Sequence, residues 1–208
     1  MSVFDRLAGQ EDVVSQLQAA AAAARQMVAD TVENTSSPAE SGFSGDGDEV
    51  ARAKMTHAWL FTGPPGSGRS IAARCFAAAL QCESTQGPGC GECEVCRAVM
   101  EDRHPDVTVV RPEGLTISVK EIRGIVARAS TFPATGQWQV VIIEDADRLT
   151  EQAGNALLKA VEEPPSHTVF ILCAPSDDPQ DIMLTLRSRT RHIYVRMPST
   201  EAVAQLLE

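Results

Sequence analysis

Short apolar runs alternate along the chain with longer segments in which apolar residues recur every three to four positions. The short runs are typical of buried strands and the longer segments of amphipathic helices. Strands are expected at 58–62, 107–110, 139–143, 168–173 and 192–195, and helices at 10–29, 69–80, 118–130, 150–163 and 182–187. Continuous apolar strands alternating with helices predict an α/β fold, in which helices flank a parallel sheet on both faces.

Two segments depart from this alternation. Residues 30–48 are dominated by Ser, Gly, Glu, Asp and Pro and show no apolar period, so we expect a flexible insertion there. Residues 199–208 begin a helical pattern, with Ser199 or Thr200 as its cap, and the chain stops within it. We therefore expect one domain over residues 1–197, a second beginning at 198–208, and a chain that is the N-terminal part of a longer protein.

Charge and composition narrow the classes of function. The 208 residues carry a net charge of −10, whereas a stand-alone nucleic-acid binder usually presents a basic surface. Protein partners are therefore favoured. The apolar runs are too short to cross a membrane, and the N-terminus shows no secretory signal. We expect a cytoplasmic protein with no membrane partner.

Residues 63–70 join the first predicted strand to the next predicted helix. Their order matches a phosphate-binding loop, except that Arg69 takes the place of the usual lysine. Backbone N–H groups and the helix N-terminus would bind the phosphates of ATP or ADP, and Ser70 would offer its hydroxyl to Mg²⁺. Guanidinium is planar and bulkier than ammonium, so we expect phosphate binding without efficient hydrolysis. The alternative is a glycine-dependent turn that binds no nucleotide. The candidate nucleotide-binding residues are Gly63, Pro64, Pro65, Gly66, Ser67, Gly68, Arg69 and Ser70.

Glu144 and Asp145 follow the third predicted strand. Nucleotide hydrolases place a metal-ligating acid and a water-activating acid at this position. The usual order is Asp then Glu, so each side chain here has the wrong length for its expected role. This predicts a degenerate acidic motif, and the alternative is two acids that only cap a strand end.

Four cysteines, Cys82, Cys90, Cys93 and Cys96, lie among glycines shortly after the phosphate-loop helix. Four thiolates at this spacing predict a structural Zn²⁺ site over residues 82–96. Disulfides are the first alternative, which a reducing compartment disfavours. An iron–sulfur cluster is the second, but the bacterial spacing would need a cysteine where Met100 stands. The other two cysteines, Cys75 and Cys173, are expected in the core.

Three further phrases carry a family resemblance: His104-Pro-Asp106, the segment 155–165 (NALLKAVEEPP) and the segment 185–189 (TLRSR). Together with the phosphate loop, the four-cysteine insert and the acidic strand, they make the chain resemble the bacterial clamp-loader branch of AAA+ proteins from residue 7 to about 195. The resemblance implies an AAA+ P-loop domain with an inserted zinc module, followed by the start of a lid domain.

Within that branch, the departures at Arg69, at Glu144-Asp145 and at the segment 173–176 resemble the delta-prime type of subunit, which acts as a stator. The resemblance implies little or no ATPase activity of its own. It also implies that Arg189, in a Ser-Arg-Thr turn, is donated in trans as an arginine finger to ATP on a neighbouring subunit. The alternative is that Arg187, Arg189 and Arg191 form an ordinary basic strip.

The partners that the resemblance implies are the gamma/tau and delta subunits in a hetero-oligomeric ring, the sliding clamp, and primer-template DNA reached through the DNA polymerase III complex in replication. Two other functions stay open at this point. The first is an ATP-hydrolysing motor subunit of the gamma/tau type. The second is a zinc-containing DNA-binding adaptor with a vestigial nucleotide fold.

Overall fold

A computed structural model describes residues 2–35, 55–112 and 114–205. Five strands form one sheet in the order β2-β3-β4-β1-β5, and all four strand pairs are parallel. The strands are β1 (Ala58–Thr62), β2 (Val107–Val110), β3 (Gln139–Ile143), β4 (Thr168–Ala174) and β5 (Arg191–Tyr194). Because the strands are parallel, the loops that follow β1, β3 and β4 all leave from the same edge of the sheet.

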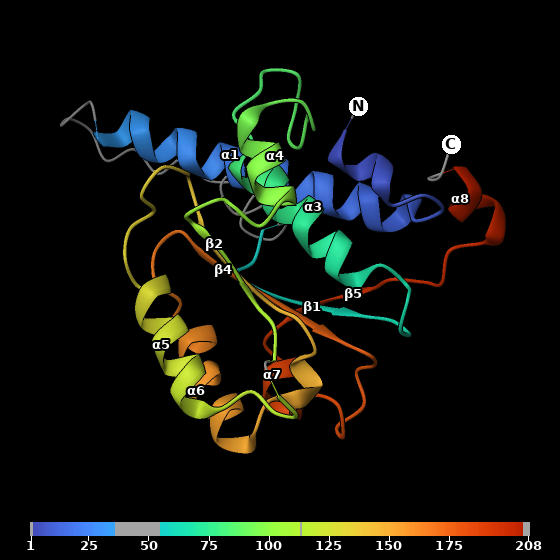
Figure 1. Cartoon of the computed structure of the whole chain (residues 1–208). Coiled ribbons are helices and arrows are strands. Elements are labelled where there is room, and N and C mark those ends of the chain that lie inside the picture. Colours follow the sequence, from blue (N-terminus) through green and yellow to red (C-terminus); the bar gives the residue numbers. More distant parts are fainter. Residues whose placement is uncertain (1, 36–54, 113, 206–208) are drawn as a thin grey trace.

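Helices cover both faces of the sheet (Figure 1). The helices α1, α3 and α4 lie on one face and α5, α6 and α7 on the other. Their bounds are α1 (Glu11–Thr35), α3 (Arg69–Gln81), α4 (Glu94–Met100), α5 (Val119–Ala129), α6 (Glu151–Glu162), α7 (Leu184–Arg187) and α8 (Thr200–Gln205), with short 3-10 turns η1 (Val3–Arg6) and η2 (Ala146–Arg148).

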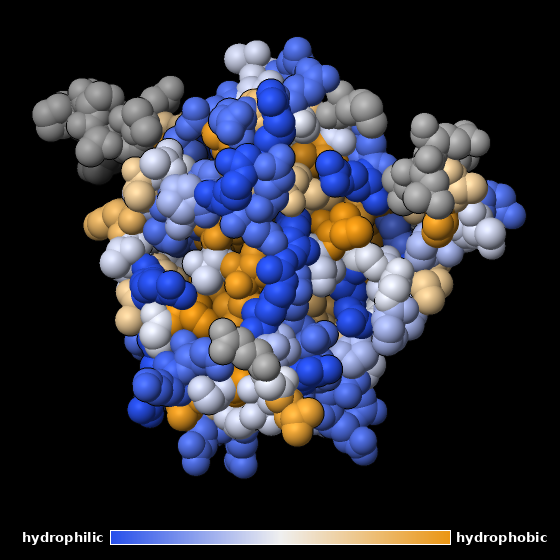
Figure 2. All heavy atoms as spheres, in the orientation of Figure 1, coloured by the Kyte–Doolittle hydropathy of each residue, from blue (hydrophilic) through white to orange (hydrophobic). Residues whose placement is uncertain are grey.

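Two hydrophobic cores lie on either side of the sheet. On β1, Trp59 and Phe61 enter the core beneath α1 and α3, whereas Leu60 enters the core beneath α5 and α6. This follows from the alternation of side chains along a strand. Both cores accept apolar residues, which explains why the strands read as continuous apolar runs. Figure 2 shows that hydrophilic residues cover much of one outer face, with separate apolar patches between them.

The predicted fold class is confirmed, and the element boundaries differ in a few places. The first helix continues to Thr35, through residues 30–35, which were expected to be insertion; residues 36–48 lie outside the described part of the chain. The predicted helix at 182–187 is limited to one turn, α7. The helix α4, seven residues long and capped by the side chain of Cys93, was not predicted from the sequence.

Cys75 and Cys173 are buried, as predicted. In the part of the chain that the structure describes, no helix combines the length and the apolar character needed to cross a membrane.

Candidate functional site

The phosphate loop joins the end of β1 to the start of α3, as the sequence predicts. Gly68 is the N-cap of α3 with φ +94°, a left-handed conformation that glycine adopts without strain. A Cβ built on Gly63 would lie 2.1 Å from the backbone oxygen of Val195, so only glycine fits there. The loop is therefore held tightly against the chain that leaves β5.

Arg69 folds back over this loop, and its guanidinium donates a hydrogen bond to the carbonyl oxygen of Gly63. The Ser67 hydroxyl is buried and has no hydrogen-bond partner among the described residues. Ser70 lies in the first turn of α3, and its backbone oxygen accepts a hydrogen bond from Arg74 at 3.1 Å. Thus the charged group expected to reach a phosphate contacts the loop's own backbone.

Glu144 lies just beyond β3, at the edge of the sheet from which the phosphate loop also leaves. Its Oε1 accepts from Arg74 at 2.7 Å and its Oε2 from Arg111 at 3.2 Å. Asp145, the second predicted acid, has φ +51° and a side chain that is 44% exposed, with Arg148 4.0 Å away. The two acids therefore differ in environment, and Glu144 already has two cationic partners.

Asp102 completes a closed arrangement with Glu144 and the two arginines. It accepts from Arg74 Nε at 2.8 Å and from Arg111 at 2.5 Å. We call Arg74, Asp102, Arg111 and Glu144 the charge ring. Burial alone would raise the pKa of Asp102, but the hydrogen bonds and charges of the two arginines outweigh burial and lower it. Arg74, Asp102 and Arg111 were not predicted from the sequence, because nothing local in the sequence signals that they meet Glu144.

The charge ring bears on the Mg²⁺ that the sequence predicted at this edge. Mg²⁺ requires oxygen ligands about 2.0–2.1 Å away in near-octahedral geometry. Both carboxylate oxygens of Glu144 accept hydrogen bonds from guanidinium groups. In this arrangement the residues do not fit Mg²⁺ held between Glu144 and Ser70.

The four predicted zinc ligands do come together. The sulfur atoms of Cys82, Cys90, Cys93 and Cys96 all lie within 4.8 Å of one another. A tetrahedron with Zn–S bonds of about 2.3 Å needs sulfur atoms about 3.8 Å apart. The Cys82 and Cys93 sulfurs are 4.0 Å apart. All six cysteines of the chain are free thiols in the structure, so the disulfide alternative is not formed.

Backbone groups further support the use of these sulfurs as thiolates. The backbone N–H of Cys90 donates to Cys82 Sγ at 3.5 Å, and that of Cys96 donates to Cys93 Sγ at 3.3 Å. Hydrogen bonds from the backbone of Cys93 and Glu92 lower the pKa of Cys90 to about 6, whereas burial raises the pKa of Cys93 and of Cys96. Those two thiols would therefore ionise only when a metal ion binds them. The donor set, its spacing and these hydrogen bonds fit Zn²⁺.

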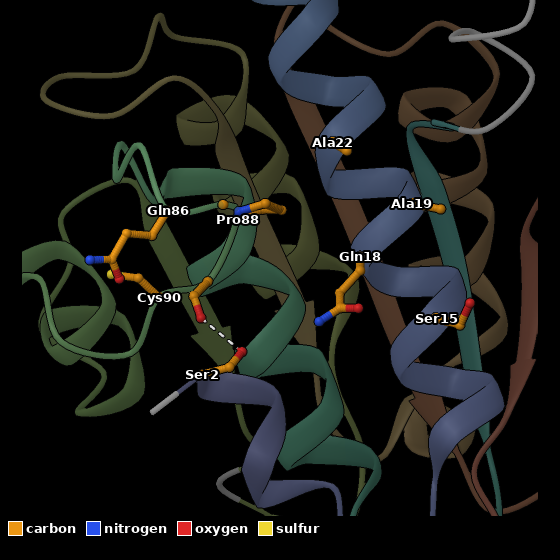
Figure 3. A pocket seen from close by; sticks show the side chains of 10 residues that line it. Ser2, Ser15, Gln18, Ala19, Ala22, Gln86, Pro88 and Cys90 are labelled. Atoms are coloured by element: carbon orange, nitrogen blue, oxygen red, sulfur yellow. Dashed lines mark hydrogen bonds between the residues drawn. The ribbon is translucent and has the colours of Figure 1, made fainter.

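The cysteine module is also tied to the N-terminal part of the chain. Arg25 on α1 donates to the carbonyl oxygens of Ser84 at 2.9 Å and Gly87 at 3.2 Å, and also to that of Cys82. Ser2 Oγ donates to the Gly89 oxygen at 3.0 Å (Figure 3). A cavity of about 620 Å³ opens between α1 and this loop. The residues that line it belong to the segments 2–22 and 86–90, and none of them is acidic or basic. The cavity therefore offers no group that would recognise a phosphate by charge.

Arg189 follows Ser188, the C-cap of α7, and its side chain is 42% exposed. It donates to the Thr185 oxygen at 3.1 Å and forms an ion pair with Glu162 at 2.8 Å. Arg187 instead pairs with Asp177 at 2.6 Å, and the Arg191 guanidinium lies 5.0 Å from the centre of the Trp59 ring. The three arginines therefore have different partners.

Comparison with known proteins identifies the family of this chain. A family model described as DNA polymerase III, delta subunit, matches residues 47–199. That is well over half of the chain.

The chain belongs to this family.

Curated relatives come from the same replication machinery. The DNA polymerase III subunit delta′ of Yersinia pestis is 36% identical over 154 residues, which cover 73% of this chain and 45% of that protein. The DNA polymerase III subunit gamma/tau of Mycobacterium tuberculosis is 35% identical over 158 residues, covering 74% and 27%. This clamp-loader family member thus spans less than half of either relative.

Solved structures agree on the architecture. A DNA polymerase III gamma subunit-related protein from Thermotoga maritima has 26% identity and a TM-score of 0.53, and the match covers 69% of this chain and 42% of that one. A mutant RuvB of Thermotoga maritima has 16% identity and a TM-score of 0.50, and the match covers 96% of this chain and 50% of that one. The second likeness shows the fold alone, which is the AAA+ type that the sequence predicted.

One of the sequence motifs on which the resemblance rests, His104-Pro-Asp106, has a structural explanation in this family member. Asp106 is 1% exposed, and its carboxylate accepts the backbone N–H groups of Ala134, Thr135 and Gly136 at 2.6, 2.8 and 2.7 Å. His104 Nδ1 accepts the N–H of Asp106 at 3.2 Å. The His-Pro-Asp phrase therefore joins the start of β2 to the loop before β3, and it has a structural role.

Proposed function

We propose that this chain is a delta′-type, stator-like subunit of the DNA polymerase III clamp loader. It helps to load the sliding clamp onto primed DNA, as part of a cytoplasmic ring with gamma/tau and delta subunits. It supplies Arg189 in trans to ATP on a neighbouring gamma/tau subunit. Its four cysteines hold a structural Zn²⁺, and its phosphate loop binds ATP or ADP weakly and without turnover.

The observation that carries the stator assignment is the position of Arg69. In a working phosphate loop a lysine ammonium reaches the β and γ phosphates. Here the residue in that position is hydrogen-bonded to Gly63 of its own loop. A phosphate would have to displace this contact, and the planar guanidinium would then meet it at a different distance and angle.

The surface position of Arg189 supports its role in trans. Its only charged partner among the described residues is Glu162, and both side chains are at least 40% exposed. Exposed ion pairs contribute about 0–1 kcal/mol. Releasing Arg189 toward a neighbouring subunit therefore costs little. An arginine that reaches a transferring phosphoryl group stabilises its developing charge and is worth on the order of 10³–10⁵ in rate.

The test is reconstitution of the complete ring from the full-length subunits. Its clamp- and DNA-stimulated ATPase is compared for wild type, Arg189→Ala and the matched control Arg187→Ala, which removes an arginine of similar exposure. We expect Arg189→Ala to assemble normally and lose at least about tenfold in rate, while the control stays within twofold. An unchanged rate in Arg189→Ala would remove the finger from the proposal. Mg²⁺-dependent turnover by this chain alone would favour the gamma/tau motor instead.

A further inference from the structure

The charge ring joins four segments that are far apart in the sequence. Arg74 belongs to α3, Asp102 follows α4 of the cysteine module, Arg111 follows β2, and Glu144 follows β3. Each acid contacts both arginines, at distances of 2.7 and 3.2 Å for Glu144 and 2.8 and 2.5 Å for Asp102. The ring contains two positive and two negative groups, so it is neutral and internally satisfied.

One guanidinium in this ring contacts Ser70, whose hydroxyl was expected to bind Mg²⁺, and Glu144, which stands where nucleotide hydrolases place a metal-ligating acid. Arg74 donates to Glu144 Oε1 at 2.7 Å and to the backbone oxygen of Ser70 at 3.1 Å. Arg111 takes the other oxygen of Glu144. The Glu144 carboxylate therefore accepts hydrogen bonds from two charged donors, and its side chain is only 15% exposed to water.

Two local features position the two acids of the ring. Glu144 has one methylene more than the Asp usual at this position, which extends its carboxylate further from the strand. Asp102 has φ +55°, a left-handed conformation that is uncommon for residues other than glycine. This conformation belongs to the C-terminal cap of α4, in which the Arg103 N–H donates to the Ala98 oxygen at 2.8 Å and the Asp102 N–H to the Val99 oxygen at 3.1 Å. The cap places the Asp102 carboxylate beside both arginines.

We propose that Arg74 and Arg111 occupy the cation position at Glu144, so that this nucleotide-type site excludes a divalent metal ion. The inference rests on the proposed function in taking the loop as a nucleotide site, and it specifies why turnover is absent. A divalent ion at Glu144 would have to displace at least one guanidinium and would then lie beside the other positive charge. Arg74 and Arg111 are thus specificity-determining residues, and Asp102 is a positioning residue for both.

The experiment uses Mn²⁺ as the probe, measured by electron paramagnetic resonance on the full-length, zinc-loaded protein, alone and with ADP. Mn²⁺ prefers oxygen ligands, so the thiolate site keeps its zinc. The main variant is Arg111→Gln, because the Arg111 side chain is 54% exposed and its loss is compatible with folding. The second variant is Glu144→Asp, which shortens the carboxylate. The matched control is Arg103→Gln, since Arg103 pairs with Glu101 outside the ring.

We expect wild type and Arg103→Gln to add nothing to the Mn²⁺ binding of free ADP. Arg111→Gln and Glu144→Asp should bind Mn²⁺ at least tenfold more tightly than wild type. The proposal is overturned if wild type binds Mn²⁺ as tightly as the variants, or if neither variant gains affinity. Because this measurement needs only the isolated chain, its failure is separate from a failure of the Arg189 test in the assembled ring.

Discussion

Asp106 is a single side chain on which the connection between β2 and the loop before β3 depends. Its carboxylate, 1% exposed, accepts three backbone N–H groups, the Thr135 hydroxyl at 3.1 Å and Gln139 Nε2 at 3.3 Å. We predict that Asp106→Asn, which keeps the shape and removes the charge, strongly destabilises the fold. The asparagine amide group would face donors in place of an acceptor oxygen, so some of these N–H groups would lose their partner.

The size of the effect follows from the geometry. A hydrogen bond to a charged group contributes about 1.5–3 kcal/mol, and the substitution affects several such bonds. The donors Ala134 and Thr135 belong to exposed residues, so water can replace part of what they lose. We therefore expect a loss of about 2–4 kcal/mol in the free energy of unfolding. For a domain of this size, that lowers Tm by roughly 4–16 °C.

The dependence on pH gives a second, independent signature. Burial would raise the pKa of Asp106, but the hydrogen bonds from the backbone of residues 134–136 outweigh burial and lower it. A carboxyl whose pKa is lowered by folding contributes stability above its unfolded value, about 3.9, and loses that contribution as the pH falls through its folded pKa. The difference between wild type and Asp106→Asn should be full at neutral pH and shrink below about pH 4.

The assay is urea unfolding followed by the fluorescence of the protein's tryptophans, one of which, Trp138, is buried next to this loop. Any zinc held by the cysteine module would be lost from both proteins at low pH, so the difference between them isolates the carboxylate. The control is Glu163→Gln at the exposed end of α6, which should stay within about 0.5 kcal/mol of wild type. A variant as stable as wild type at neutral pH, or a difference that does not fall with pH, would refute the reasoning.

Three further predictions concern the cysteine module and the phosphate loop. Cys96→Ser should reduce bound zinc from about one equivalent per chain to well below that and lower the thermal midpoint, measured by a chelator assay and calorimetry; full zinc content would exclude Cys96 as a ligand. Arg25→Ala should speed zinc release to a chelator several-fold, because it removes the donor to Ser84 and Gly87; release at the wild-type rate would show that the module holds itself. Gly63→Ala should cost about 2–4 kcal/mol in urea unfolding, since its Cβ would meet the Val195 oxygen at 2.1 Å; normal stability would show that the chain after β5 can move aside.

The sequence determined the parts of this protein that are encoded locally. Apolar strands, amphipathic helices and their order predict a parallel sheet with two covered faces, because those patterns record burial on one side or both. The phosphate loop and the four cysteines were found by spacing, since their geometry depends on residues close in the chain. The helix α4 was missed because its seven residues are too few to show a period.

Only the tertiary structure decided what Glu144 contacts. Its position after β3 was predicted, but its partners come from α3 and from the end of β2, which the strand order β2-β3-β4-β1-β5 brings to one edge. The same holds for Arg69, whose charge was visible in the sequence and whose hydrogen bond to its own loop was not. A sequence records which charges are present, whereas the packing of distant segments decides which of them neutralise one another.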